Sequence, residues 1–113
     1  MTYLKNLNDL DFIPYKRYGT VIEKIFWYNI NYSDKTGIGS YVLKFEPGAK
    51  TKEHIHLDTE NFIVLKGSIY DSFYKMTFKK NSFISLEKDT IHYSSSDEGC
   101  ILLVFSQGHI KRF

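Results

Sequence analysis

The chain has 113 residues, a length typical of one domain with a single buried core. Its net charge of +2 gives no support to nucleic-acid binding, and the absence of a long apolar run or of a signal-peptide pattern favours a cytoplasmic protein without membrane contact. Its single cysteine, Cys100, rules out an internal disulfide and lies in an apolar run that predicts a buried thiol.

The amino-terminal segment, residues 2–15, carries leucines at steps of three between asparagine and aspartate residues. These polar residues argue against a stable helix, and we expect Pro14 to end the segment. Residues 1–19 are therefore interpreted as an arm that packs over a sheet edge or onto a partner subunit.

Two long strands are predicted next, over residues 20–32 and 38–46, with a polar turn at 33–37 between them. The aromatic content of the chain, 17%, supports this interpretation, because aromatic side chains favour strands. In the second strand, one face carries Tyr41, Leu43 and Phe45.

The central part of the chain predicts several short strands separated by polar turns. Gly67 suits a hairpin position with positive φ, and the polar run 94–99 is interpreted as a loop. Strands are expected at 54–56, 61–65, 68–74, 75–78, 83–86 and 91–93.

Residues 100–105 are apolar on both faces, which predicts cover on both sides of that strand, from the arm or from a second subunit. Strands recurring every 8 to 12 residues without a clear helix indicate an all-β sandwich or small barrel. The barrel is expected over residues 20–106, followed by a tail, 107–113, that holds His109 at the surface.

Residues 54–60 have the spacing of a metal site. His54 and His56 project to one face of a strand, and Glu60 is an even step further along. His92 follows another apolar segment and supplies a third imidazole. Imidazole and carboxylate suit iron, manganese, nickel and zinc, although a His-x-His pair alone is more often a solvated polar face.

These residues resemble the cupin family. Gly48, His54, His56, Glu60 and Gly67 match its first motif at every spacing. Its second motif is degraded: the histidine is kept as His92, while the other positions are occupied by Asn81, Glu87, Asp89 and Ser96. The chain is most similar to the cupin domain of ChrR-type zinc anti-sigma factors and to small dioxygenases that cleave diketones.

The resemblance implies a double-stranded β-helix, or jelly-roll barrel, that forms one domain over residues 1–113 and commonly dimerises. It also implies that one divalent ion (Fe, Zn, Ni or Mn) is held by His54, His56, Glu60 and His92. Such a shell leaves coordination positions open, as catalytic sites do.

Two classes of function follow from this resemblance. The first is a small-molecule dioxygenase that acts on an enolisable ketone or diketone. The second is a ligand- or metal-sensing module without turnover, and the degraded second motif also leaves room for a vestigial, empty site. Because no arginine stands beside the motifs, a neutral or enolisable substrate is favoured over a strongly anionic one. The candidate pocket residues are Tyr41, Phe45, Phe62, Tyr70 and Tyr93.

Overall fold

The computed structural model describes residues 6–17 and 19–112. Within these residues, regular structure consists of strands and one 3-10 turn, η1 (Leu7–Asp9), so the all-β prediction is confirmed. The strands are β1 (Ile13–Arg17), β2 (Thr20–Asn29), β3 (Ile38–Phe45), β4 (Ala49–Lys50), β5 (His54–His56), β6 (Glu60–Asp71), β7 (Met76–Lys79), β8 (Phe83–Leu86), β9 (Ile91–His92), β10 (Ser94–Ser96), β11 (Cys100–Gln107) and β12 (Ile110–Arg112).

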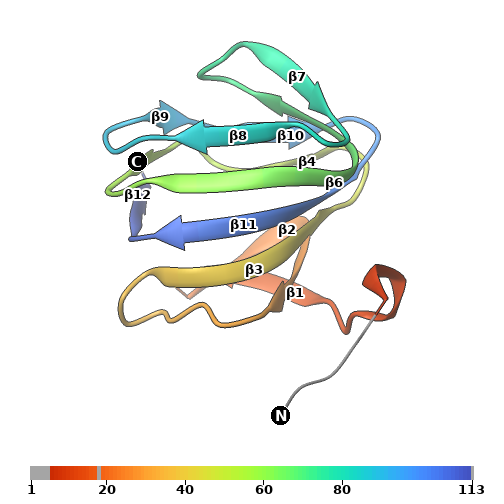
Figure 1. Ribbon diagram of the computed structural model, residues 1–113, viewed down its shortest axis with the longest axis horizontal. Helices are drawn as coiled ribbons and strands as arrows, with labels where there is room; N and C mark the ends of the chain where they lie inside the picture. Colours follow the sequence, from red (N-terminus) through yellow and green to blue (C-terminus); the bar gives the residue numbers. More distant parts are fainter. Residues whose placement is uncertain (1–5, 18, 113) are drawn as a thin grey trace.

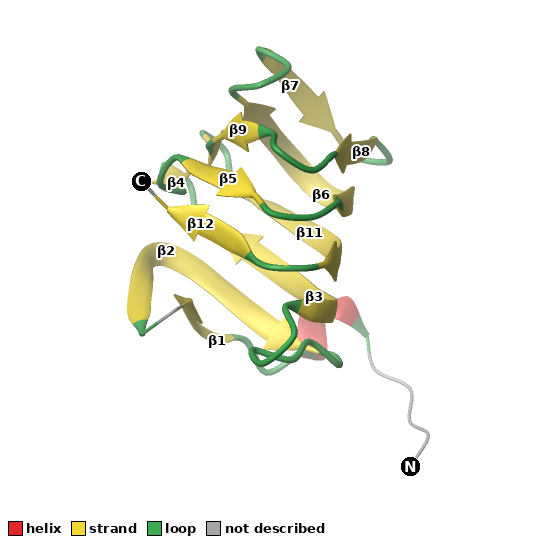
Figure 2. Cartoon of the chain, turned by 90° about the vertical axis from the view of Figure 1, so that its left-hand side faces the viewer, coloured by secondary structure: helices red, strands yellow, loops and turns green. Residues whose placement is uncertain are grey.

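The strands form two sheets that face each other as a barrel (Figures 1 and 2). The larger sheet has the order β1-β2-β3-β11-β6-β10-β4, and β7 and β8 also pair with β6. The smaller sheet, β12-β5-β9, covers the open side of the curled larger sheet in Figure 2. This arrangement is the expected jelly roll.

The core lies between these sheets and follows the predicted alternation. On β3, Tyr41 and Phe45 are buried while Lys44 between them is exposed. On the paired strand β11, Leu102 and Val104 face the same interior. Burying one face of each strand is the main stabilising term of such a barrel, because apolar area removed from water dominates folding.

The sequence predicts a hairpin at Gly67. In the structure Gly67 lies instead inside the continuous strand β6. The register of β6 against β11 shifts just before Gly67, between Val64 and Lys66, which marks a β-bulge. Gly67 has φ +74°, and a Cβ there would collide with the carbonyl oxygen of Gly99. The bulge changes which side chains point inward, from Phe62 and Val64 before it to Ile69 and Asp71 after it.

Two other segments expected to be irregular also form strands. Pro14 does not end its segment, because β1 is an edge strand, where a residue without an N–H group is tolerated. Ser94–Ser96 forms β10 rather than a loop, and its inward serines have partners: the Ser96 hydroxyl donates to the Ser68 carbonyl at 2.6 Å. The predicted tail likewise contains β12, which pairs with β5.

Part of the amino-terminal segment lies beside the outer face of β11, a central strand rather than a sheet edge. Leu7, Leu10 and Phe12 line one shallow groove together with Ile101 of β11. Lys44 Nζ lies 5.5 Å from the centroid of the Phe12 ring. Residues 1–5 of the predicted arm lie outside the described part of the chain. None of the helical structure described here is long and apolar enough to span a membrane.

Candidate metal centre

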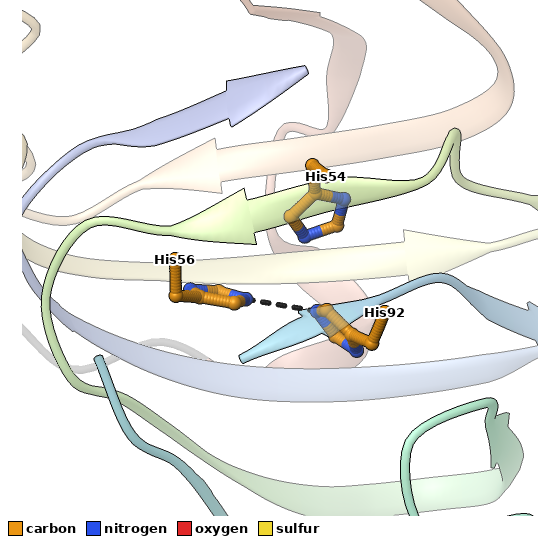
Figure 3. A group of neighbouring side chains, drawn as sticks. All are labelled: His54, His56 and His92. Atoms are coloured by element: carbon orange, nitrogen blue, oxygen red, sulfur yellow. Dashed lines mark hydrogen bonds between the residues drawn. The ribbon is translucent and has the colours of Figure 1, made fainter. Parts of the chain in front are cut away.

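Three buried histidines converge inside the barrel. His54 and His56 lie on β5, and His92 lies on β9 directly opposite His54 in the pairing of these strands. Their rings point toward one another in Figure 3, and one ligand nitrogen from each lies within 4.8 Å of the others. The fourth histidine, His109, is elsewhere, with its Nε2 at 3.4 Å from the Lys35 carbonyl.

The spacing of the imidazole nitrogens fits a shared metal ion. His56 Nε2 and His92 Nε2 are 2.8 Å apart. Two nitrogens that bind one ion at about 2.1 Å and at right angles lie about 3.0 Å from each other. The two rings are therefore already close to the separation that a common ion requires.

Hydrogen bonds on the far side of two rings fix their orientation. His54 Nδ1 donates to the Lys52 carbonyl at 2.7 Å, and His92 Nδ1 donates to Asp71 Oδ1 at 2.6 Å. A proton held on Nδ1 leaves Nε2 as the lone-pair atom, which is the usual arrangement of metal-binding histidines.

Asp71 is a site residue that the sequence reasoning missed. Its carboxylate is fully buried, and Oδ2 accepts hydrogen bonds from the backbone N–H groups of Phe73 at 3.0 Å and Tyr74 at 3.3 Å. Simple alternation along β6 points Tyr70 inward instead of Asp71. The bulge at Gly67 reverses this parity, so a glycine in mid-strand four residues earlier is the signal that could have revealed Asp71.

Electrostatics hold His56 in the form that binds metal. Burial lowers its pKa to about 3, and Coulombic interactions with His92, His54 and Arg17 act in the same direction. Because metals bind the neutral imidazole, His56 needs no deprotonation at neutral pH.

Glu60 shares the cavity with the histidines but, among the described residues, is not part of the close three-histidine group. The Tyr41 hydroxyl donates to Glu60 Oε2 at 3.5 Å. Burial raises the pKa of Glu60, and the nearby charges of Arg17 and His92 oppose that shift. The role of Glu60 as fourth ligand stays a prediction.

A cavity of about 60 Å³ adjoins the histidines. Tyr41, Phe45 and Phe62, three of the candidate pocket residues, lie on its wall. Tyr70 and Tyr93 lie instead beside each other on outward-facing positions, with ring centroids 6.2 Å apart.

Arg17 is a second wall residue that the sequence reasoning missed. It comes from the edge strand β1 and is only 2% exposed. Its Nη1 donates to the hydroxyl of Tyr15 at 2.5 Å and to that of Tyr41 at 3.3 Å, and its Cζ lies 4.8 Å from the centroid of the Tyr32 ring. The cavity therefore contains a buried cation that does not adjoin the motifs in sequence.

Comparison with known proteins agrees with this architecture. The sequence profile of the ChrR cupin-like domain matches residues 4–111, almost the whole chain. A search of curated proteins finds no match.

Among solved structures, an acetylacetone dioxygenase from Acinetobacter johnsonii has a TM-score of 0.82 at 14% identity, over 100% of this chain and 78% of that one. An RmlC-like cupin protein from Ralstonia eutropha JMP134 has a TM-score of 0.77 at 18% identity, over 97% and 71% of the two chains. The polyketide cyclase RemF from Streptomyces resistomycificus has a TM-score of 0.76 at 14% identity, over 99% and 85%. At these identities the likeness shows the shared cupin fold alone.

Proposed function

The chain belongs to the ChrR cupin-like domain family, and from this premise we propose that it is a metal-binding cupin that acts on a small molecule. The observation that carries the proposal is the convergence of three buried imidazoles, His54, His56 and His92, on one point. Glu60 is proposed as the fourth ligand, since it lines the same cavity. We also propose that residues 1–113 form one domain.

The donor set suits iron, zinc, nickel or manganese, and a bound ion of this kind supplies Lewis-acid or redox chemistry at the inner end of the cavity. The chain's own residues then have distinct tasks. Asp71 orients His92 by accepting a hydrogen bond from the Nδ1 proton of His92. Apolar side chains such as Phe62 and Val104 exclude water from the ligand.

The reaction we propose is dioxygenase cleavage of an enolisable ketone or diketone. Three or four protein ligands leave open coordination positions for substrate, as catalytic sites require. The similarity in fold to an acetylacetone dioxygenase is consistent with this reaction class. A ligand-sensing module without turnover is the second candidate, and the match to the ChrR cupin-like domain supports it.

The partners proposed are a small-molecule ligand and a second copy of this chain. The second copy is proposed because an apolar row on the outer face of the larger sheet ends at the exposed Phe83. We keep the cytoplasm as the proposed location.

Metal analysis and oxygen consumption separate these candidates. The protein is purified without chelator or metal-affinity resin, its metal is quantified, and oxygen uptake is recorded with acetylacetone and other β-diketones. Iron with oxygen uptake supports the dioxygenase, and tightly bound zinc without turnover supports the sensor. Absence of any metal would contradict both.

The ligand assignment is tested with a matched pair of variants. His56→Ala is expected to abolish metal retention while the barrel stays folded, because it removes one of the three converging imidazoles. His109→Ala removes a histidine near the Lys35 carbonyl and should retain full metal content. Stoichiometric metal in His56→Ala would refute the assignment.

A further inference from the structure

We propose that the ligand of this cavity is a small oxo-carboxylate, whose carboxylate is bound by Arg17 with the hydroxyl of Tyr15 while its oxo end faces the three histidines. This inference rests on the proposed function and narrows its substrate class. It replaces the expectation of a neutral substrate, which followed from the lack of an arginine next to the motifs.

The donors for a carboxylate are already assembled on one side of the cavity. Arg17 stays protonated at any working pH and presents a planar fork that matches carboxylate geometry. Tyr15 Oη accepts a hydrogen bond from Arg17 Nη1 at 2.5 Å, so its own proton is directed elsewhere. Tyr15 keeps its proton, because burial raises the pKa of its phenol.

Arg17 places its charge in the same cavity as the proposed metal ligands. It lines this cavity together with His54, Glu60 and His92. A divalent ion held by neutral imidazoles and one carboxylate adds further positive charge. An anionic ligand is therefore favoured over a neutral ligand of the same shape, since charge interactions are strong in a site that excludes water.

The cavity also limits the ligand's size and the polarity of its middle part. Its volume of about 60 Å³ encloses only a handful of atoms. Most of the remaining lining is apolar and includes Leu43, Phe62 and Val104, while Glu60 adds a carboxylate beside the histidines. A short chain with one charged end and one metal-facing oxygen fits this distribution of groups.

Arg17 also has a structural role to be weighed, because it ties β1 to the barrel through Tyr41. A purely structural role predicts that a substitution lowers stability and leaves the selectivity between ligands unchanged. An anchoring role predicts a change in selectivity. The test must therefore compare two ligands of equal size.

Acetoacetate and acetylacetone form such a pair, because they differ only in a carboxylate oxygen in place of a methyl group. Both are titrated by calorimetry into protein loaded with zinc, which removes turnover as a complication. We expect the native protein to bind acetoacetate roughly 10- to 100-fold more tightly than acetylacetone. In Arg17→Met the preference should disappear, through weaker binding of acetoacetate and little change for acetylacetone.

Lys52→Met is the matched control, since Lys52 also borders the cavity and carries a positive charge but is exposed to solvent. It should retain the preference. If Arg17→Met does not fold, as judged by its thermal unfolding, Tyr15→Phe replaces it and should weaken acetoacetate binding about fivefold while sparing acetylacetone.

Three results would overturn the proposal: equal affinities in the native protein, a preference that survives in Arg17→Met, or no binding of either probe. Failure of the proposed function has a different signature. It would appear as absence of metal from the purified protein. The titration can then be repeated with the metal-free protein and with His56→Ala. If the proposal holds, both should still prefer acetoacetate, and the preference should still depend on Arg17.

Discussion

The imidazole of His92 has a different neighbour on each ring nitrogen. Nε2 faces His56 at the proposed metal position, while Nδ1 donates to the buried carboxylate of Asp71 at 2.6 Å. That carboxylate is itself held by the backbone N–H groups of Phe73 and Tyr74. A negatively charged acceptor on the far side of the ring makes Nε2 a stronger donor to metal.

Asp71→Asn should therefore weaken metal binding about 10- to 100-fold while the barrel stays folded. An asparagine amide nitrogen cannot accept hydrogen bonds as an aspartate oxygen does, so one of the present partners is lost. Competition with a chromophoric chelator measures the effect. Ser94→Ala, which removes a hydroxyl at 3.4 Å from Asp71 Oδ1, serves as control and should change affinity less. Native affinity in Asp71→Asn would contradict this role.

Cys100 is predicted to be unreactive in the folded protein. Burial raises the pKa of its thiol to about 12, and thiolate is the reactive form. Alkylation by iodoacetamide at pH 8 should occur only after denaturation, as followed by mass spectrometry. Labelling of the folded protein at the rate of a free thiol would disprove this expectation.

The same shift makes stability depend on pH in a defined direction. The unfolded thiol ionises near pH 9 and the folded one near pH 12, so the stability contributed by the protonated thiol is complete below pH 9 and is lost as the pH rises toward 12. The loss is about 4 kcal/mol in the free energy of unfolding. Cys100→Ala should lack this contribution and is the reference in the denaturant titrations.

The site residues that the sequence did not reveal were hidden for two physical reasons. Asp71 was missed because strict alternation fails across a bulge. Arg17 was missed because it precedes the first motif by more than thirty positions, and only the pairing of β1 with β2 brings it to the cavity. His54 and His56 were recognisable because their spacing in sequence is that of one strand face, and His92 was recognisable because it keeps the histidine of the second motif.

At the scale of elements, the bulge at Gly67 is the feature on which the site geometry depends. It lets one strand, β6, contribute Glu60 before the bulge and Asp71 after it, both toward the interior. The required backbone conformation has φ +74° and leaves no room for a Cβ next to the carbonyl of Gly99.

Gly67→Ala is therefore expected to destabilise the protein by about 2–4 kcal/mol, from left-handed strain and the steric collision together. Gly19→Ala is a close control, because Gly19 has φ +79° but no atom within 4 Å of the added Cβ, and it should cost only about 1 kcal/mol. Urea unfolding of the two variants measures the difference. Equal losses in the free energy of unfolding would show that the backbone relieves the collision with the Gly99 carbonyl without a loss of stability.

The long strands were predictable, and the short or polar ones were not. Regular alternation identified β3, and the apolar run identified β11, because each buries one whole face in the core. Gly67 was misread because hairpins and bulges both use positive φ. Ser94–Ser96 was misread because serines are typical of loops, whereas here their hydroxyls are satisfied inside the barrel.

At the scale of the whole molecule, the outer face of the larger sheet carries a continuous apolar row across five strands. The residues of this row pair in register from β2 to β8, and the amino-terminal segment lies over the neighbouring row rather than this one. The row consists of Tyr28, Val42, Leu103, Ile63 and Phe83. Phe83 is exposed, Tyr28, Ile63 and Leu103 are partly buried, and Val42 is buried. The exposed part of this row is an apolar surface of the kind found at subunit contacts.

Phe83→Glu should dissociate the proposed homodimer into folded monomers, because Phe83 is 62% exposed at the end of this row. Phe73→Glu changes an equally prominent phenylalanine, 54% exposed, in the turn between β6 and β7, and should leave the assembly intact. Sedimentation velocity distinguishes the two states. A native protein that sediments as a monomer would remove the basis for this contact.

Arg17 belongs to β1, an edge strand that takes its hydrogen bonds in the sheet from β2. Edge strands open transiently more often than central ones, and their amide protons exchange with solvent sooner. A ligand bound to Arg17 would suppress that opening, so adding acetoacetate should slow deuterium uptake across β1. The central strands β3 and β11 are already protected and should change little. Entry to the cavity and fraying of this edge would then be two aspects of one motion.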